Sequence, residues 1–103
     1  MTDFVHWYPL REAVQHAPPE TGVFQIRVAD GLLDYPQGKS AMVYYGQATD
    51  LRDSIQQVAR EHNEADFLCR HQSSEQPAVL LEFVLNNFER RFGTAPSWPT
   101  PSS

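Results

Sequence analysis

Residues 21–29, TGVFQIRVA, and residues 41–48, AMVYYGQA, decide the fold of this chain. From Phe24 to Val28 apolar and polar side chains alternate, which is the periodicity of a β-strand with one buried face. The second stretch is rich in valine and tyrosine, which favour strands. Residues 30–40, DGLLDYPQGKS, hold two glycines, a proline and two aspartates, so they predict a long loop. Two strands joined by one loop indicate an antiparallel pair.

Helical patterns precede and follow this pair of strands. From Asp3 to Ala17 apolar residues recur at helical spacing, and Pro9 suits a first helical turn. Thr49 or Asp50 is a suitable N-cap for a second helix that continues to about residue 62. The inward stripe of that second helix consists of Leu51, Ile55, Val58 and His62.

The C-terminal part of the chain predicts a long helix. Residues 73–76, SSEQ, have the spacing of a capping box, and the helix extends over about residues 75–92, with Gly93 as its C-cap. Residues 78–85 are apolar nearly all round the helix, so we expect this part to be well buried. Glu82 lies inside this run. Because an unpaired buried carboxylate is costly, we expect it to face a cleft, bind a cation or pair with an arginine.

Residues 66–72, DFLCRHQ, alternate in the same way as the first strand and predict a third, short strand. The order helix, strand, loop, strand, helix, strand, helix predicts an α+β fold, with a small three-stranded, mainly antiparallel sheet flanked by helices. The 103 residues are enough for one compact domain. We place it over residues 1–93, with residues 1–20 as an N-terminal helical extension and residues 94–103 as a Pro/Ser-rich tail.

Composition and charge exclude several classes of protein. Eight Lys and Arg residues against thirteen Asp and Glu give a formal net charge of -5, which disfavours strong, sequence-independent coating of DNA. The single cysteine, Cys69, excludes an internal disulfide and zinc sites of the CxxC type. The longest apolar run, residues 78–81, is far shorter than a membrane span, so the expected compartment is the cytoplasm.

Several residues, taken in this order, resemble the GIY-YIG nuclease family. Gly22-Val23-Phe24 is similar to the first half-motif, and Tyr44-Tyr45-Gly46 is similar to the second. The residues that follow, 47–52 (QATDLR), are similar to the family's YIGKAxNLRxR passage. Val79-Leu80-Leu81-Glu82 resembles the family's LLLE segment. Together these motifs extend over residues 22–92, most of the chain.

The resemblance implies hydrolysis of a DNA phosphodiester with Mg²⁺ as cofactor. In that chemistry one glutamate holds the metal, two tyrosines orient or activate the water, and an arginine stabilises the charge of the phosphorane. By resemblance, Glu82 is the metal ligand and Tyr44 is a catalytic tyrosine. The resemblance gives the neighbouring binding residues as Tyr45, Gly46, Gln47 and Arg52, with Gln47 where the family often has lysine.

The chain departs from the family pattern at catalytic positions. Phe24 occupies the position of the first tyrosine and has no hydroxyl to place a water. Ser54 occupies the position of the helix arginine, and neither Arg52 nor Arg60 lies on the same side of the predicted helix. Thr94 lies near the position of a late asparagine. Since the loss of one preorganised charge stabiliser costs on the order of 100- to 1,000-fold in rate, we expect a degenerate nuclease site.

Three functions remain open at this point. The first is a non-catalytic module that binds nucleic acid or a protein through the former active-site groove. The second is a divergent Mg²⁺-dependent nuclease in which Tyr44 or Tyr45 orients water, Glu82 holds the metal, and Arg52 or Arg60 replaces the lost cation. The third is a protein-interaction or assembly subunit without any vestigial site.

Other reactive side chains predict structural roles. The four histidines do not occur at the spacing of metal ligands; they are His6, His16, His62 and His71. Cys69 is typical of a small buried hydrophobe. Three arginines form either a small basic patch or partners of helix dipoles; they are Arg70, Arg90 and Arg91. Three aromatic residues near the chain ends form either a lid over the core or a partner site; they are Trp7, Tyr8 and Trp98.

Overall fold

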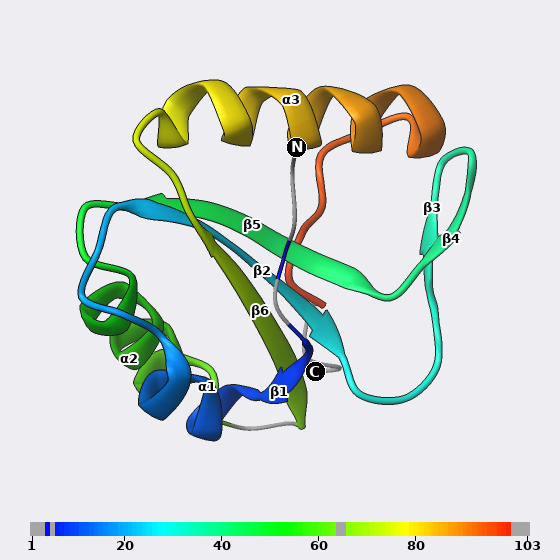
Figure 1. The fold of residues 1–103 in the computed structure, drawn as a ribbon. Helices are drawn as coiled ribbons and strands as arrows, with labels where there is room; N and C mark the ends of the chain where they lie inside the picture. Colours follow the sequence, from blue (N-terminus) through cyan, green and yellow to red (C-terminus); the bar gives the residue numbers. More distant parts are fainter. Residues whose placement is uncertain (1–3, 5, 64–65, 100–103) are drawn as a thin grey trace.

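The computed structural model describes residues 4, 6–63 and 66–99. Within them the chain has an α+β fold with three helices, a four-stranded antiparallel sheet and a separate hairpin (Figure 1). In chain order the elements are β1 (Tyr8–Pro9), α1 (Leu10–His16), β2 (Gly22–Val28), β3 (Leu33–Tyr35), β4 (Gly38–Ser40), β5 (Met42–Ala48), α2 (Leu51–Glu61), β6 (Phe67–Ser73) and α3 (Pro77–Phe92). None of the helices found in these ranges is long and apolar enough to cross a membrane.

The sheet has the strand order β1-β6-β2-β5, so β2 lies between its two long partners. Phe24 is opposite Gly46 of β5 on one side and opposite His71 of β6 on the other. The three predicted strands and their antiparallel pairing are therefore confirmed. The short β1 adds a fourth strand at the edge, where Tyr8 pairs with Cys69.

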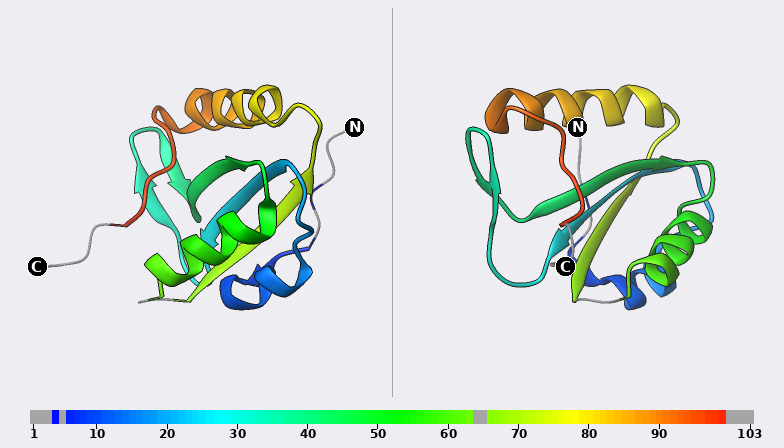
Figure 2. Two further views of the ribbon diagram at one scale, coloured as in Figure 1. Left: turned by 90° about the vertical axis from the view of Figure 1, so that its left-hand side faces the viewer. Right: turned by 180° about the vertical axis from the view of Figure 1, so that it is seen from behind.

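Helices cover the sheet on both faces. Figures 1 and 2 show α1 and α2 together on one face and α3 across the other. Because opposite residues of antiparallel strands point to the same face, the partners of Phe24 also face α1 and α2. The core lies on that side and consists of Leu10, Ala13, Ala17, Phe24, Ile26, Val43, Ala48, Leu51, Ile55, Phe67 and Cys69.

The second helix begins where its sequence predicts. The Asp50 carboxylate accepts a hydrogen bond of 3.0 Å from the backbone N–H of Asp53, which is an N-cap contact. Leu51 and Ile55 are fully buried against the core. His62 at the C-cap stacks on Trp98, with the ring centroids 3.7 Å apart.

The N-terminal helix is shorter than its sequence pattern predicts. It begins at Leu10, because Tyr8 and Pro9 pair with β6 as strand β1. Asp3, where the predicted helix begins, lies outside the described residues, as do residues 1–2, 5 and 100–103 of the predicted extension and tail.

Two local predictions in the connecting segments are wrong. Residues 30–40 are not a loop throughout: β3 and β4 form a hairpin there, closed by Pro36 and Gln37. The predicted capping box is also absent from the start of α3. Ser73 is still in β6 and donates its hydroxyl proton to Glu20, and Gln76 is the N-cap without a side-chain cap bond.

The expected burial of residues 78–85 in α3 is wrong, because none of these residues is buried. The C-cap of the helix is Gly93, which has a left-handed φ of 86°, as the glycine predicts. Phe88 is buried against the sheet, but Val79 is 61% exposed and Phe83 is 56% exposed. The helix is apolar on two sides, and the sheet covers one of them. No described residue forms a further layer over the other side.

Candidate functional site

The two half-motif strands are neighbours, and their glycines lie where other groups approach closely. A Cβ atom on Gly46 would lie 2.6 Å from Cε2 of Tyr44 and 3.0 Å from Cζ of Phe24. A Cβ atom on Gly22 would meet the carbonyl oxygen of Gln72 and would lie 2.7 Å from a methyl group of Leu51. Packing alone therefore accounts for both glycines.

Tyr44 lies on the face of the sheet that carries the core. Its ring is 5.7 Å from the ring of Phe24 and stacks on Trp98 at 5.5 Å, with 23° between the planes. Trp98 also stacks on His62 and meets Phe67 edge-on. The indole of the C-terminal segment thus lies over the tyrosine that the family resemblance makes catalytic.

Tyr45 points to the opposite face of the sheet. Its ring meets Phe88 of α3 edge-on at 5.6 Å. Burial raises the pKa of Tyr45 to about 12, although the positive charge of Arg70 acts in the opposite direction. A phenol with this pKa stays protonated at neutral pH, and it shares no face with Tyr44.

The arginine that follows the second half-motif has a structural contact. Nε of Arg52 donates a hydrogen bond of 2.9 Å to the carbonyl oxygen of Ala17, the C-cap residue of α1. Ser54, at the family's arginine position, is half-buried on α2. Arg60 in the last turn of α2 and Gln47 on β5 are exposed.

Glu82 is exposed on α3, across the sheet from Tyr44. It makes no ion pair with any described residue. Phe24, Tyr44 and Gly46 come together, but Glu82 does not join them. The described residues also contain no group of three or more His, Cys, Asp or Glu side chains that could hold a metal ion. The implied Mg²⁺ site needs only one glutamate, so it is the separation of Glu82 from Tyr44 that does not fit the arrangement that the resemblance implies.

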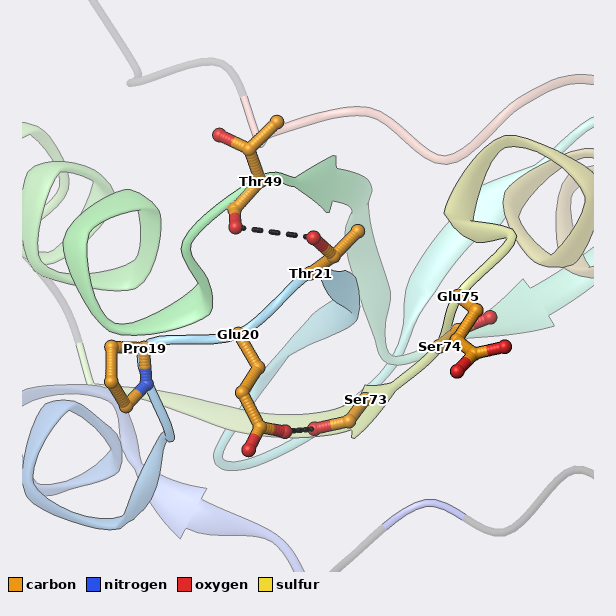
Figure 3. Close-up of a pocket in the computed structure, with 7 residues that line it drawn as sticks. All are labelled: Pro19, Glu20, Thr21, Thr49, Ser73, Ser74 and Glu75. Atoms are coloured by element: carbon orange, nitrogen blue, oxygen red, sulfur yellow. Dashed lines mark hydrogen bonds between the residues drawn. The ribbon is translucent and has the colours of Figure 1, made fainter.

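An open hollow lies where β2 begins, between the start of α2 and the end of β6 (Figure 3). Its lining is made of hydroxyl and carboxylate groups with one proline: Pro19, Glu20, Thr21, Thr49, Ser73, Ser74 and Glu75. Ser73 donates to Glu20 at 2.9 Å, and Thr21 donates to the carbonyl oxygen of Thr49 at 3.3 Å. These bonds join three segments of chain, and none of the predicted site residues lines the hollow.

The remaining candidates are separated in the structure. Cys69 is fully buried, which confirms its prediction as a small hydrophobe, and burial raises the pKa of its thiol to about 12. The three terminal aromatic rings have different partners: Trp7 contacts Arg70, Tyr8 stacks on His16, and Trp98 stacks on Tyr44. They do not form one lid.

Gln25, which the sequence pattern did not single out, meets Arg70 on the face of the sheet that carries α3. Gln25 is only 3% exposed and accepts a hydrogen bond of 2.6 Å from Nε of Arg70. Arg27 lies on the same face of β2, two residues along. The alternation of β2 assigns Gln25 and Arg27 to the polar face, and α3 together with the rings of Trp7 and Phe4 lies over that face.

Comparison of the chain with protein-family models, with curated proteins and with solved structures found no match.

Proposed function

We propose that this chain is a non-catalytic, GIY-YIG-like binding module that holds a protein partner on the outer side of α3. One observation carries the proposal: Val79 is 61% exposed and Phe83 is 56% exposed on a helix whose other side already packs on the sheet. An exposed cluster of large apolar side chains is typical of an interaction surface.

The placement of the motif residues supports the family part of the proposal. Gly22 and Ala48, at the outer ends of the half-motif strands, are opposite each other in an antiparallel pair. α2 begins directly after the second half-motif, and the segment that carries Glu82 is the late helix α3. This is the order of motifs on which the resemblance rests.

The surroundings of the same residues support the absence of catalysis. Phe24 offers no hydroxyl, Tyr44 lies under Trp98, and Arg52 is engaged with the end of α1. Tyr44 is opposite Ile26 on the core face of the sheet, whereas Glu82 is on α3, which lies across the other face. Phosphoryl transfer depends on groups that converge on one phosphate, and these groups do not converge.

The chemistry of the outer side of α3 favours a protein over a nucleic acid. Val79, Leu80 and Phe83 line a shallow hollow together with Ser74 and Gln76. Glu75 and Glu82 are exposed within the segment that lines the hollow and would repel a polyanion there, whereas the exposed Arg90 and Arg91 lie in the last turn of α3. An apolar side chain next to lysine or arginine would fill the hollow and pair with this acidic border.

Purified chain incubated with supercoiled plasmid and Mg²⁺ or Mn²⁺ tests the absence of catalysis. We expect no nicking above that of a Glu82→Ala variant, because Glu82 and Tyr44 do not share a site. Metal-dependent nicking that disappears in Glu82→Ala would contradict this part of the proposal.

Selection of short random peptides on the immobilised chain tests the binding surface. We expect the enriched peptides to contain a large apolar residue beside lysine or arginine. Fluorescence anisotropy with a synthetic peptide should show at least about tenfold weaker binding to Phe83→Asp, since a buried aromatic anchor supplies much of an interface energy. Gln56→Asp, on exposed α2 surface, makes the same change in charge and should bind like the parent chain.

Two outcomes would contradict the binding proposal. One is a selected peptide that binds Phe83→Asp as tightly as it binds the parent chain. The other is a dimer of the parent chain in sedimentation velocity that becomes a monomer in Phe83→Asp. In that case a second copy of the chain, and not a different protein, covers the outer side of α3.

A further inference from the structure

Two arginines lie close together on the α3 face of the sheet without a carboxylate. Arg70 of β6 is opposite Gln25 of β2, and Arg27 is the next residue of β2 on that face. The positive charge of Arg27 is close enough to help lower the pKa of Arg70, after the larger effect of burial. Within the described residues the one ion pair is Lys39 with Asp34, on the hairpin. Neither arginine is neutralised there.

Each guanidinium is held at one nitrogen and keeps its other donors. Nε of Arg70 donates to the side-chain oxygen of the buried Gln25 at 2.6 Å. Nε of Arg27 donates to the backbone carbonyl of Val28 at 3.1 Å. A guanidinium has N–H donors on all three nitrogens. The terminal N–H groups of both arginines therefore have no acceptor among the described residues.

Aromatic rings border the pair of cations. The Trp7 ring centroid is 4.5 Å from Cζ of Arg70 and 5.5 Å from Cζ of Arg27. The Phe4 ring centroid is 4.8 Å from Cζ of Arg70. These contacts stabilise the cations without removing their charge. Trp7 is only half-buried, so part of its ring surface is open to solvent.

We propose that Arg27, Arg70 and Trp7 form a binding site for one nucleotide unit, with its phosphate between the two guanidiniums and its base against Trp7. A phosphate oxygen accepts charge-assisted hydrogen bonds from the terminal N–H groups and neutralises two like charges at once. A nucleobase stacks on an aromatic side chain whatever its sequence.

The net charge of -5 favours a short ligand over a long polyanion. A free nucleotide and the end of a single strand present the same phosphate and base, so both are sources of this unit. The site lies on the sheet and not on the outer side of α3, so it does not rest on the proposed protein-binding function.

Titration of ¹⁵N-labelled full chain with dTMP tests the site through the indole N–H signal of Trp7 and the Nε–H signals of Arg27 and Arg70. We expect saturable shifts of all three signals. Thymidine, which lacks the phosphate, and deoxyribose 5-phosphate, which lacks the base, should each bind at least about tenfold more weakly. Oligo(dT) that binds more tightly than dTMP identifies a single strand as the source, and equal affinity identifies the free nucleotide.

Charge-matched variants separate the site from general attraction to cations. Arg27→Gln should weaken dTMP at least about tenfold, and it leaves the Arg70–Gln25 bond in place. Arg60→Gln removes the same charge from exposed α2 surface and should bind like the parent chain. Arg70→Lys keeps the positive charge but loses the planar guanidinium with its paired N–H donors, so it should also weaken binding. This variant tests the role of Arg70 even if Arg70→Gln fails to fold. Equal dTMP affinity of Arg27→Gln and Arg60→Gln, or no saturable shift of Trp7, would overturn the proposal.

Discussion

His71 lies on the face of β6 that packs toward α1 and α2, and it is 5% exposed. Its Nε2 has no hydrogen-bond partner among the described residues. Burial holds the pKa of His71 below its ordinary value of 6.5, and the nearby His16 lowers it further. The native state therefore holds this imidazole neutral, whereas the unfolded chain protonates it near pH 6.5.

Acidification is expected to destabilise the fold through His71. Because the folded pKa is below the unfolded pKa, the unfolded state binds more protons as the pH falls below about 6.5, and stability falls with it. The slope from one such group is at most about 1.4 kcal/mol per pH unit. Urea unfolding at a series of pH values measures this dependence. The free energy of unfolding should change less steeply with pH in His71→Gln than in the parent chain. His6→Gln, at an exposed histidine, should keep the parent slope, and equal slopes in all three proteins would refute this origin.

At the scale of the elements, one side chain of α2 holds the end of α1. Arg52 donates to the carbonyl of Ala17, and the backbone N–H groups of Leu51 and Arg52 donate to the carbonyls of Glu20 and Pro18. The segment after α1 is thus joined to the first turn of α2 by three bonds. Arg52 therefore has a structural role in this fold. It does not act as the cation that the nuclease hypothesis required to replace the missing arginine.

Arg52→Met is expected to lower the free energy of unfolding by about 1 kcal/mol, because it removes a charge-assisted bond from a partly exposed site. Arg60→Met removes the same charge further along α2 and should change it by less than about 0.5 kcal/mol. Urea unfolding of both variants measures the difference. Equal values would show that the Ala17 bond contributes nothing to stability.

The long strands and α2 were predictable because their signals are local. Phe24, Ile26 and Val28 alternate over a full strand, and Asp50 is a cap whose partner is three residues away. The hairpin β3–β4 has strands of three residues, too short for any periodicity, although Pro36 and Gln37 mark its turn. The exposure of the outer side of α3 was not predictable. An apolar pattern shows which sides of a helix are apolar, but it does not show whether another part of the chain packs against each of them.

The candidate site was likewise predictable only in its local features. The resemblance identified Tyr44, Gly46 and Glu82 by type and order, which are properties of the sequence. Whether they converge depends on which face of the sheet each helix covers, and α3, which carries Glu82, covers the face opposite to that of Tyr44. The pairing of Gln25 with Arg70 spans 45 positions, so no local pattern indicates it.

At the scale of the whole molecule, the C-terminal segment returns from α3 to the α2 side and is fixed at two points (Figure 2). The backbone N–H of Ser97 donates to the hydroxyl of Tyr35 at 3.2 Å, and Trp98 stacks on Tyr44 and His62. This segment therefore contacts the hairpin, β5 and α2, which follow one another in the chain and all lie far before it in the sequence.

Trp98→Ala is expected to destabilise the chain by about 1–3 kcal/mol, since it removes a partly buried indole and its stacking contacts. It should also uncover Tyr44, so that tetranitromethane nitrates this tyrosine faster, as measured by peptide mass spectrometry. Pro99→Ala, at the exposed neighbour, should leave both properties unchanged. Unchanged nitration of Tyr44 in Trp98→Ala would contradict a covering role for the indole.

The strand at the outer edge of the sheet, β1, is two residues long and ends in Pro9. Proline has no N–H to donate to a further strand, and the chain turns directly into α1. A second molecule that approached β1 would find no N–H to pair with at Pro9, and β1 covers Leu68 and Cys69 among the 7 residues of β6. The same two residues that complete the sheet therefore also hinder the addition of a further strand over this stretch of the edge, which is how fibrous aggregates grow.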